Sequence, residues 1–207
     1  MKKFILFILI IFIFPLRVNA SSIVMDADTK RVLVNNAGDE KKLIASTTKI
    51  ITAMVVINNV DIKKTVTIDE NVLKSFGSGI YVEIGEKVSV EDLLYGLMLR
   101  SGNDAAIALA CYVGGSIEGF SMLMNDLAKS IGMNNSNFIN PSGLENDDGV
   151  GNISTAYDMG LLMSYAMKND IFKTITSTKH RVVKTNYKTY DWYNKNKLLS
   201  MYKYTTG

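Results

Sequence analysis

The spacing of apolar positions changes several times along the chain, and each change predicts a different element. Residues 21–35 hold two short β-prone runs separated by the polar turn Asp-Ala-Asp-Thr-Lys, a pattern typical of a hairpin. Residues 44–60 are apolar on nearly every side beyond their first turn, which indicates a helix buried within a domain. Residues 61–88 alternate β-branched and polar positions with several glycines, so we expect short strands and loops there.

Helical spacing returns after residue 88, and several helix ends carry recognisable signals. Ser89 and Asp92 have the spacing of a capping box, and Thr155 and Asp158 repeat it. Gly132 stands where a C-terminal glycine cap belongs. The predicted helices cover residues 89–100, 104–113, 117–131 and 155–167, and a β-ribbon is predicted over residues 176–193. Because no repeat or linker divides the chain, we predict one α+β domain over residues 21–207.

The first 20 residues differ in composition from the rest of the chain. Lys2 and Lys3 precede an apolar run over residues 4–16, and Val18 and Ala20 supply the small residues typical of a cleavage site. The apolar run is short for a membrane span. We therefore predict a signal peptide over residues 1–20 and export of residues 21–207 to the cell envelope or the medium. An uncleaved N-terminal anchor is the alternative.

Charge and composition narrow the range of partners. The formal net charge is +3 and no basic stripe is interleaved with aromatic residues, so no nucleic-acid partner is expected. The single cysteine, Cys111, cannot form an internal disulfide, and its apolar neighbours predict a small buried side chain. One cysteine and one histidine cannot build a zinc site, and we expect no metal or other cofactor.

The strongest chemical signal is Ser-Thr-Thr-Lys at residues 46–49, in the first turn of the predicted buried helix. The i, i+3 spacing places the Ser46 hydroxyl and the Lys49 amine on one face. Apolar surroundings and the partial positive charge of a helix N-terminus both favour a neutral amine, which is the form that accepts a proton. The same N-terminus favours a developing oxyanion. An N-cap serine followed by a surface lysine is the alternative interpretation of these four residues taken alone.

Two further observations bear on that alternative. The only histidine, His180, falls in the predicted ribbon and is expected to face solvent, so lysine is the available base for a serine nucleophile. Ser101-Gly102-Asn103 lies between two predicted helices, where a hydroxyl and an amide can reach a shared cleft. A Ser-x-x-Lys at a helix start followed by Ser-x-Asn between helices forms two of the three motifs shared by β-lactamases and penicillin-binding proteins.

Five stretches of the chain, in order, resemble the D-alanyl-D-alanine carboxypeptidase family of low-molecular-mass penicillin-binding proteins. They lie at residues 26–33, 44–53, 97–106, 131–144 and 153–162. The resemblance implies a β-lactamase/transpeptidase-like fold, an antiparallel sheet flanked by helices with a helical subdomain. It also implies peptidoglycan stem peptides ending in D-Ala-D-Ala as substrates and β-lactams as covalent inhibitors.

The same resemblance implies roles for four residues. Ser46 would be the acylated nucleophile and Lys49 its base. Ser101 would relay a proton toward the leaving D-alanine. Asn103 would bind the substrate amide and help to hold Lys49.

The third motif of that family, Lys-Thr-Gly, is where this sequence departs from the pattern. It is absent, and the chain reaches Gly207 just before the expected position. Thr-Thr-Gly at residues 205–207 could be a degenerate version, but its register is wrong. Lacking the cation and oxyanion donor of that strand, residues 21–207 alone are expected to be the inactive N-terminal portion of a penicillin-binding peptidase domain. The apolar faces of residues 50–60 and 93–99 would then be partly open to water.

Two other functions are compatible with the first two motifs. A serine β-lactamase shares them, but the Glu-x-x-Leu-Asn pattern expected for rapid hydrolysis of its acyl-enzyme does not occur here. A non-catalytic cell-wall-binding remnant would also keep them without the third. No C-terminal amphipathic anchor is encoded in this chain, so an association with the membrane surface is not predicted from it.

Overall fold

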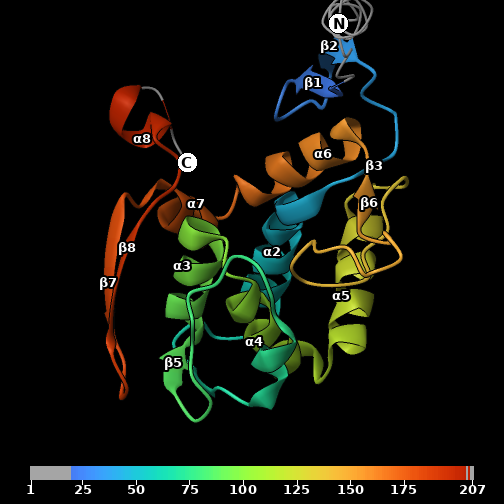
Figure 1. Ribbon diagram of the computed structural model, residues 1–207. Coiled ribbons are helices and arrows are strands. Elements are labelled where there is room, and N and C mark those ends of the chain that lie inside the picture. Colours follow the sequence, from blue (N-terminus) through green and yellow to red (C-terminus); the bar gives the residue numbers. More distant parts are fainter. Residues whose placement is uncertain (1–19, 204, 206–207) are drawn as a thin grey trace, which may run out of the picture.

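The computed structural model describes residues 20–203 and 205 (Figure 1). The predicted signal peptide, except for its last residue, lies outside this described part of the chain. Of the alternative third motif at residues 205–207, only Thr205 is described. The described residues form a body of packed helices bordered by small antiparallel sheets (Figure 1).

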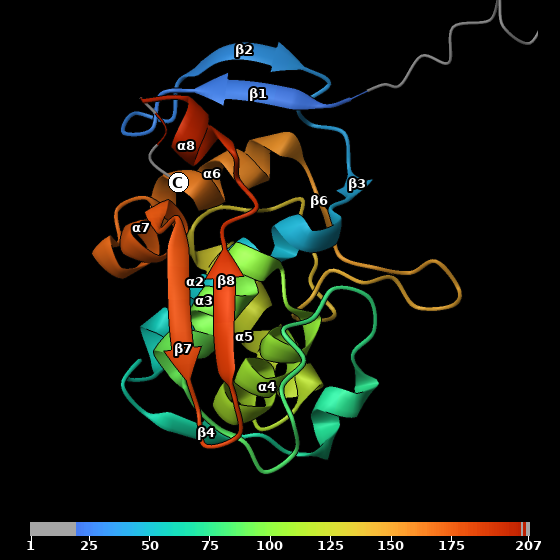
Figure 2. The ribbon, with the colours of Figure 1, turned by 60° about the vertical axis from the view of Figure 1, so that its left-hand side comes forward.

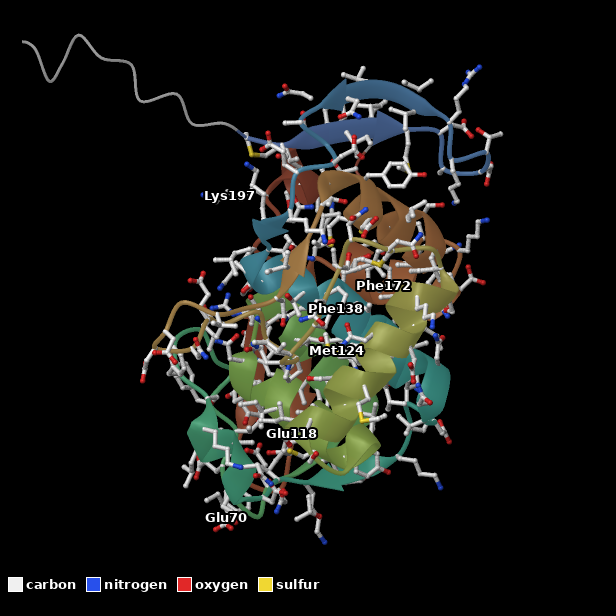
Figure 3. The ribbon with its side chains drawn as sticks, turned by 90° about the vertical axis from the view of Figure 1, so that its right-hand side faces the viewer. Glu70, Glu118, Met124, Phe138, Phe172 and Lys197 are labelled. Atoms are coloured by element: carbon white, nitrogen blue, oxygen red, sulfur yellow. The ribbon has the colours of Figure 1, made fainter. Side chains whose placement is uncertain are left out.

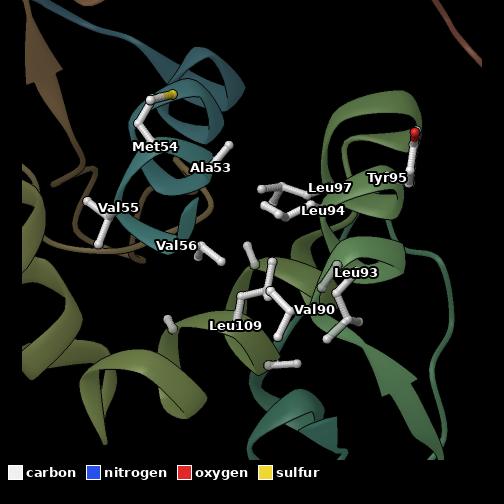
Figure 4. Close-up of a cluster of buried hydrophobic side chains, with 14 of the residues drawn as sticks. Ala53, Met54, Val55, Val56, Val90, Leu93, Leu94, Tyr95, Leu97 and Leu109 are labelled. Carbon is white, nitrogen blue, oxygen red and sulfur yellow. The ribbon is translucent and has the colours of Figure 1, made fainter. Parts of the chain in front are cut away.

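The helix α2 (Lys49–Asn59) lies at the centre of the body, which explains why its sequence is apolar on nearly every side. It contacts α3 (Val90–Arg100), α4 (Asn103–Gly114), α5 (Ile117–Ser130), α6 (Ala156–Ala166) and α7 (Asp170–Ser177). Figure 4 shows Ala53 and Val56 of α2 facing Leu94 and Leu97 of α3. Burial of one large apolar side chain of this kind contributes roughly 1.5–3 kcal/mol. Among the described residues no single helix is long and apolar enough to cross a membrane; only α4 and α5 together, bent by 84°, meet that test.

This packing shows that one expectation from the sequence is wrong. The apolar faces of residues 50–60 and 93–99 are largely closed: Ile51, Leu93 and Leu99 are each 0% exposed, and the remaining apolar residues are at least partly buried against the core. The reason is that α2 and α3 cover each other, while α4 and its neighbours close the remaining sides. Apolar side chains are exposed instead on the N-terminal hairpin, where Leu33 and Val34 are each 55% exposed.

Strands occur as two-stranded antiparallel pairs in the described part of the chain. The predicted N-terminal hairpin is confirmed: β1 (Ser22–Met25) pairs with β2 (Val32–Asn36) and crosses above α6 (Figure 2). The other pairs are β3 (Lys42–Leu43) with β6 (Ile153–Ser154), β4 (Thr65–Thr67) with β5 (Lys87–Ser89), and β7 (His180–Lys184) with β8 (Thr189–Tyr193). The β7–β8 ribbon lies along α3 (Figure 2), where Arg181 donates to the Asp92 carboxylate at 2.7 Å.

The helix ends confirm the predicted signals. The Ser89 side chain accepts a hydrogen bond from the N–H of Asp92, and Thr155 does the same for Asp158. Gly132, just beyond α5, has φ +87°, a left-handed conformation that glycine adopts without a steric penalty.

The helix α7 was not predicted, and it replaces the first two residues of the predicted ribbon. Its threonines and isoleucines favour strands by propensity. The Asn169 side chain nevertheless caps its first turn, and Phe172 and Ile175 are buried against the body, so tertiary packing decides the conformation. Three shorter helices were also not predicted as separate elements: η1 (Ala45–Thr48), η2 (Glu70–Lys74) and α8 (Leu198–Met201). Cys111 is half-buried rather than buried.

Residues 139–152 form a long loop whose start is anchored in the core. Phe138, just before the loop, is 1% exposed and lies inside the molecule near Met124 of α5 (Figure 3). The Asn125 side chain accepts a hydrogen bond from the N–H of Phe138 and donates one to its carbonyl oxygen, at 2.9 and 2.7 Å. The loop therefore begins from a fixed point beside α5.

Candidate active site

Ser46 and Lys49 lie where two helical segments join. Ser46 belongs to the 3₁₀ helix η1, and Lys49 is the first residue of α2. The Ser46 side chain is exposed, whereas Lys49 is 2% exposed. The Ser46 hydroxyl is thus accessible to a ligand, whereas the Lys49 amine beside it is shielded from solvent.

The Lys49 Nζ has three hydrogen-bond partners drawn from three parts of the chain. It lies 2.7 Å from Asn103 Oδ1, 2.7 Å from the carbonyl oxygen of Ser142 and 3.1 Å from Ser46 Oγ. The first two partners can only accept, so a neutral amine directs both of its N–H groups at them. Its lone pair is then left for the Ser46 hydroxyl, which can donate. This arrangement suits removal of the hydroxyl proton by Lys49.

The charge state of Lys49 fits that role. Burial, and to a smaller extent the positive charge of Lys195, lowers the pKa of Lys49 from its usual 10.5 to about 8, although the negative charge of Asp104 opposes the decrease. At pH 7 about one amine in ten is therefore neutral.

Asn103 is held so that its side-chain oxygen faces Lys49. Its Nδ2 donates to the carbonyl oxygen of Phe76 at 2.6 Å, which fixes which end of the amide points to the amine. Its backbone N–H donates to the carbonyl oxygen of Ser78 at 2.8 Å. Asn103 is 3% exposed, and among the described residues only one of the two N–H groups of its Nδ2 has an acceptor.

Ser101 lies at the junction of α3 and α4, but it is not joined to the other candidate residues. It ends α3 with φ +60° and is half-buried. No hydrogen bond connects its Oγ to another residue in the described part of the chain. The structure therefore brings together Ser46, Lys49 and Asn103, and places Ser101 two residues before Asn103.

His180 is exposed, as the sequence predicted. Its Nε2 lies 2.6 Å from Asp191 Oδ1, and its ring stacks on Tyr193 at a centroid distance of 4.4 Å. Both contacts are within the β7–β8 ribbon. The imidazole is therefore engaged within the ribbon and not with Ser46.

The sequence pattern indicates a loop over residues 140–152, but sequence reasoning did not predict that this loop supplies the third partner of Lys49. The Asn140 side chain accepts hydrogen bonds from the N–H groups of Ser142 and Gly143. The Asn152 side chain donates to Thr48 Oγ1 at 3.0 Å and to the Asn140 carbonyl oxygen at 2.8 Å, which ties the loop to η1. The Asn-Pro-Ser-Gly turn is visible in the sequence, but a contact made by a backbone carbonyl leaves no side-chain signal.

Known proteins resemble this chain along most of its length. The model of the family described as D-alanyl-D-alanine carboxypeptidase (Peptidase_S11) matches residues 15–207. The D-alanyl-D-alanine carboxypeptidase DacF of Bacillus subtilis is 34% identical over 188 residues, which cover 88% of this chain and 48% of DacF. A D-alanyl-D-alanine carboxypeptidase of Streptomyces is 37% identical over 204 residues, which cover 88% of this chain and 68% of that protein. The chain thus spans about half the length of DacF.

Solved structures share the fold. A D-alanyl-D-alanine carboxypeptidase from Mycobacterium tuberculosis superposes with a TM-score of 0.85 at 29% identity, covering 90% of this chain and 70% of that one. A mutant of a Streptomyces DD-transpeptidase superposes with a TM-score of 0.84 at 34% identity, covering 94% of this chain and 80% of that one. The predicted fold class, α+β with the penicillin-binding architecture, is confirmed.

Proposed function

Because this chain belongs to the D-alanyl-D-alanine carboxypeptidase family, we propose that its protein removes the terminal D-alanine from peptidoglycan stem peptides through an acyl-enzyme on Ser46. The observation that carries the proposal is the environment of Lys49, whose buried Nζ lies within hydrogen-bond distance of two acceptors and of Ser46 Oγ. In its neutral form the amine can donate to the two acceptors and take the Ser46 proton on its lone pair. β-Lactams are the expected covalent inhibitors, and the extracytoplasmic cell envelope is the expected location.

The proposed reaction begins with proton transfer. Lys49 takes the proton of the Ser46 hydroxyl as Oγ attacks the carbonyl carbon of the penultimate D-alanine. The N–H of Ser46, which has no acceptor among the described residues, is available to the developing oxyanion. The second N–H of Asn103 Nδ2 is available to an amide carbonyl of the substrate.

Breakdown of the tetrahedral intermediate completes acylation. The C–N bond to the terminal D-alanine breaks, and the leaving nitrogen receives the proton held by Lys49, with Ser101 as the proposed relay. Water then adds to the ester on Ser46 and gives its proton to Lys49, after which the shortened peptide leaves and Ser46 regains its proton. Atoms and protons balance without a cofactor.

The identity of the acylated residue tests the proposal. Full-length protein should be labelled by penicillin, and mass spectrometry of its peptides should place the adduct on Ser46. The unlabelled protein should release D-alanine from a diacyl-D-alanyl-D-alanine peptide. An adduct on a different serine, or no adduct at all, would contradict the proposal.

The pH dependence of acylation should follow the charge of Lys49. Because the pKa of Lys49 is lowered to about 8 and the neutral amine is the active form, the rate should rise about tenfold per pH unit below 8 and level off above it. Stopped-flow or gel-based labelling with a fluorescent penicillin between pH 5 and 10 gives the profile. A rate independent of pH across this range would exclude Lys49 as the base.

A further inference from the structure

Asp104 is a buried carboxylate beside the candidate site, and the proposed reaction does not use it. It follows Asn103 directly and is 5% exposed. In the part of the chain that the structure describes, it takes part in no ion pair. A buried charge of this kind needs hydrogen-bond donors to offset the loss of hydration.

Three of those donors come from a single loop. The Asp104 carboxylate accepts hydrogen bonds from the backbone N–H groups of three consecutive residues, Ile80, Tyr81 and Val82. It also accepts one from the N–H of Ala105 at 2.9 Å, at the start of α4. Successive N–H groups that converge on one anion make a backbone nest, and here the anion is a side chain of the protein itself.

The loop at residues 76–82 has a backbone shape that requires support. Gly77 has φ +78°, and Tyr81 has φ +62° although it carries a side chain. Left-handed φ values of a bulky residue persist when surrounding contacts enforce them. The N–H groups of Tyr81 and its two neighbours are the ones bound by Asp104, so these contacts supply the support.

The other end of the same loop orients Asn103. The Phe76 carbonyl accepts from Asn103 Nδ2, and the Ser78 carbonyl accepts from the Asn103 N–H. These contacts point Asn103 Oδ1 at the Lys49 amine, 2.7 Å away. Two adjacent residues of α4 therefore bind the loop at its two ends. Asp104 accepts hydrogen bonds from residues 80–82, and Asn103 donates one to the carbonyl oxygen of Phe76.

We propose that Asp104 is a positioning residue for the reaction at Ser46: by binding the N–H groups of residues 80–82 it fixes the loop that orients Asn103 against Lys49. The inference rests on the proposed function. It adds a structural requirement to that function, because the oxygen of Asn103 meets Lys49 only while the loop stays in place.

Asp104 also acts on Lys49 through its charge. In the described part of the chain, the charged groups that influence the pKa of Lys49 are Lys195, which lowers it, and Asp104, which raises it. The direct hydrogen-bond partners of Lys49 are neutral: Ser46, Asn103 and the Ser142 carbonyl. Removing the charge of Asp104 should therefore lower the pKa of Lys49, whereas moving the carboxylate without removing its charge should leave that pKa nearly unchanged.

Two variants of the full-length protein separate these effects. Asp104→Asn removes the charge and turns an amide N–H group toward backbone donors. Gly79→Ala keeps the charge of Asp104 but displaces its carboxylate, because the added Cβ would lie 3.2 Å from Asp104 Oδ2. The φ of Gly79 is outside the left-handed region, so the alanine adds no left-handed backbone strain. Asp69→Asn is the matched control, because Asp69 is an exposed carboxylate that accepts from a backbone N–H near the same loop.

The measurement is the pH profile of Ser46 acylation by a fluorescent penicillin, with melting curves to establish that each variant is folded. Asp104→Asn should acylate about 10- to 100-fold more slowly, as expected when a catalytic group is misplaced, and its acid limb should move to lower pH. Gly79→Ala should acylate several-fold more slowly with the acid limb in place. Asp69→Asn should match the wild type in both respects.

The outcomes distinguish this inference from the proposed function. If wild-type Ser46 is not acylated, the proposed function fails. If wild-type Ser46 is acylated and folded Asp104→Asn shows the wild-type rate and acid limb, the positioning role is wrong. If Asp104→Asn does not fold, Gly79→Ala decides: a slower rate with an unmoved acid limb supports the role, and a wild-type rate overturns it.

Discussion

Replacing Lys49 by alanine should slow acylation of Ser46 about 10²- to 10⁴-fold, the usual effect of removing a general base. The physical reason is the position of the amine: Nζ lies 3.1 Å from Ser46 Oγ, and the acceptors on Asn103 and Ser142 leave the lone pair of the neutral form for the Ser46 proton. No other described side chain is bonded to Ser46 Oγ. Labelling by a fluorescent penicillin, followed over time, gives the rate for each variant.

A charge-preserving variant makes this test specific to proton transfer. Lys49→Arg keeps a positive charge, but a guanidinium does not lose its proton in proteins, so it should be as slow as Lys49→Ala. Ser46→Ala should show no labelling, and His180→Ala should label at the wild-type rate because the imidazole is engaged by Asp191. Wild-type rates in folded Lys49→Arg, or equal losses in the His180 and Lys49 variants, would discredit the lysine as base.

Signals that act within a few residues predicted much of the fold. The Ser89 and Thr155 caps and the N-terminal hairpin depend on neighbours in sequence, and all are confirmed. The i, i+3 spacing of Ser46 and Lys49 likewise predicted that hydroxyl and amine would share a face, and they lie 3.1 Å apart. Local geometry is nearly independent of the rest of the chain, which is why it can be predicted from short patterns.

Long-range contacts could not be predicted in the same way. Residues 170–177 have strand-forming composition, but they are helical because Phe172 and Ile175 pack on the body. The third partner of Lys49 is a backbone carbonyl 93 residues away, at Ser142, and any residue type could supply that atom. Asp104 was visible in the sequence, but it accepts hydrogen bonds from three N–H groups more than 20 residues earlier. Such contacts depend on tertiary packing, which short patterns do not encode.

A second large effect should follow from a single methyl group on the loop that carries Ser142. Gly143 has φ +85°, and a Cβ added there would lie 1.8 Å from the carbonyl oxygen of Ala45, the residue before Ser46. Real Cβ atoms essentially never approach so closely, and the obstacle is backbone rather than a flexible side chain. Either η1 or the loop must move, and both movements change the distance between Lys49 and one of its partners.

The Gly143→Ala protein should therefore lose both stability and activity. Left-handed strain alone costs about 1–3 kcal/mol. With the overlap added, we expect a loss of about 3 kcal/mol or more, which lowers the melting temperature by about 6–12 °C in a domain of this size. Acylation of Ser46 in the folded fraction should slow about 100-fold, because displacement of a catalytic group by about 1 Å has effects of that order.

Gly149 supplies a matched control in the same loop. Its φ is +75°, but a Cβ added there would have no atom within 4 Å, so Gly149→Ala introduces left-handed strain without the overlap. It should lower stability by about 1 kcal/mol and leave the acylation rate unchanged.

Calorimetry and penicillin labelling on both variants separate the two effects, backbone strain and steric overlap. Equal behaviour of the two alanine variants would show that the close approach of Gly143 to Ala45 does not set the geometry of the site. If Gly143→Ala acylates slowly and is strongly destabilised, while Gly149→Ala acylates at the wild-type rate with a small loss of stability, the missing side chain at residue 143 sets the position of the loop relative to Ser46.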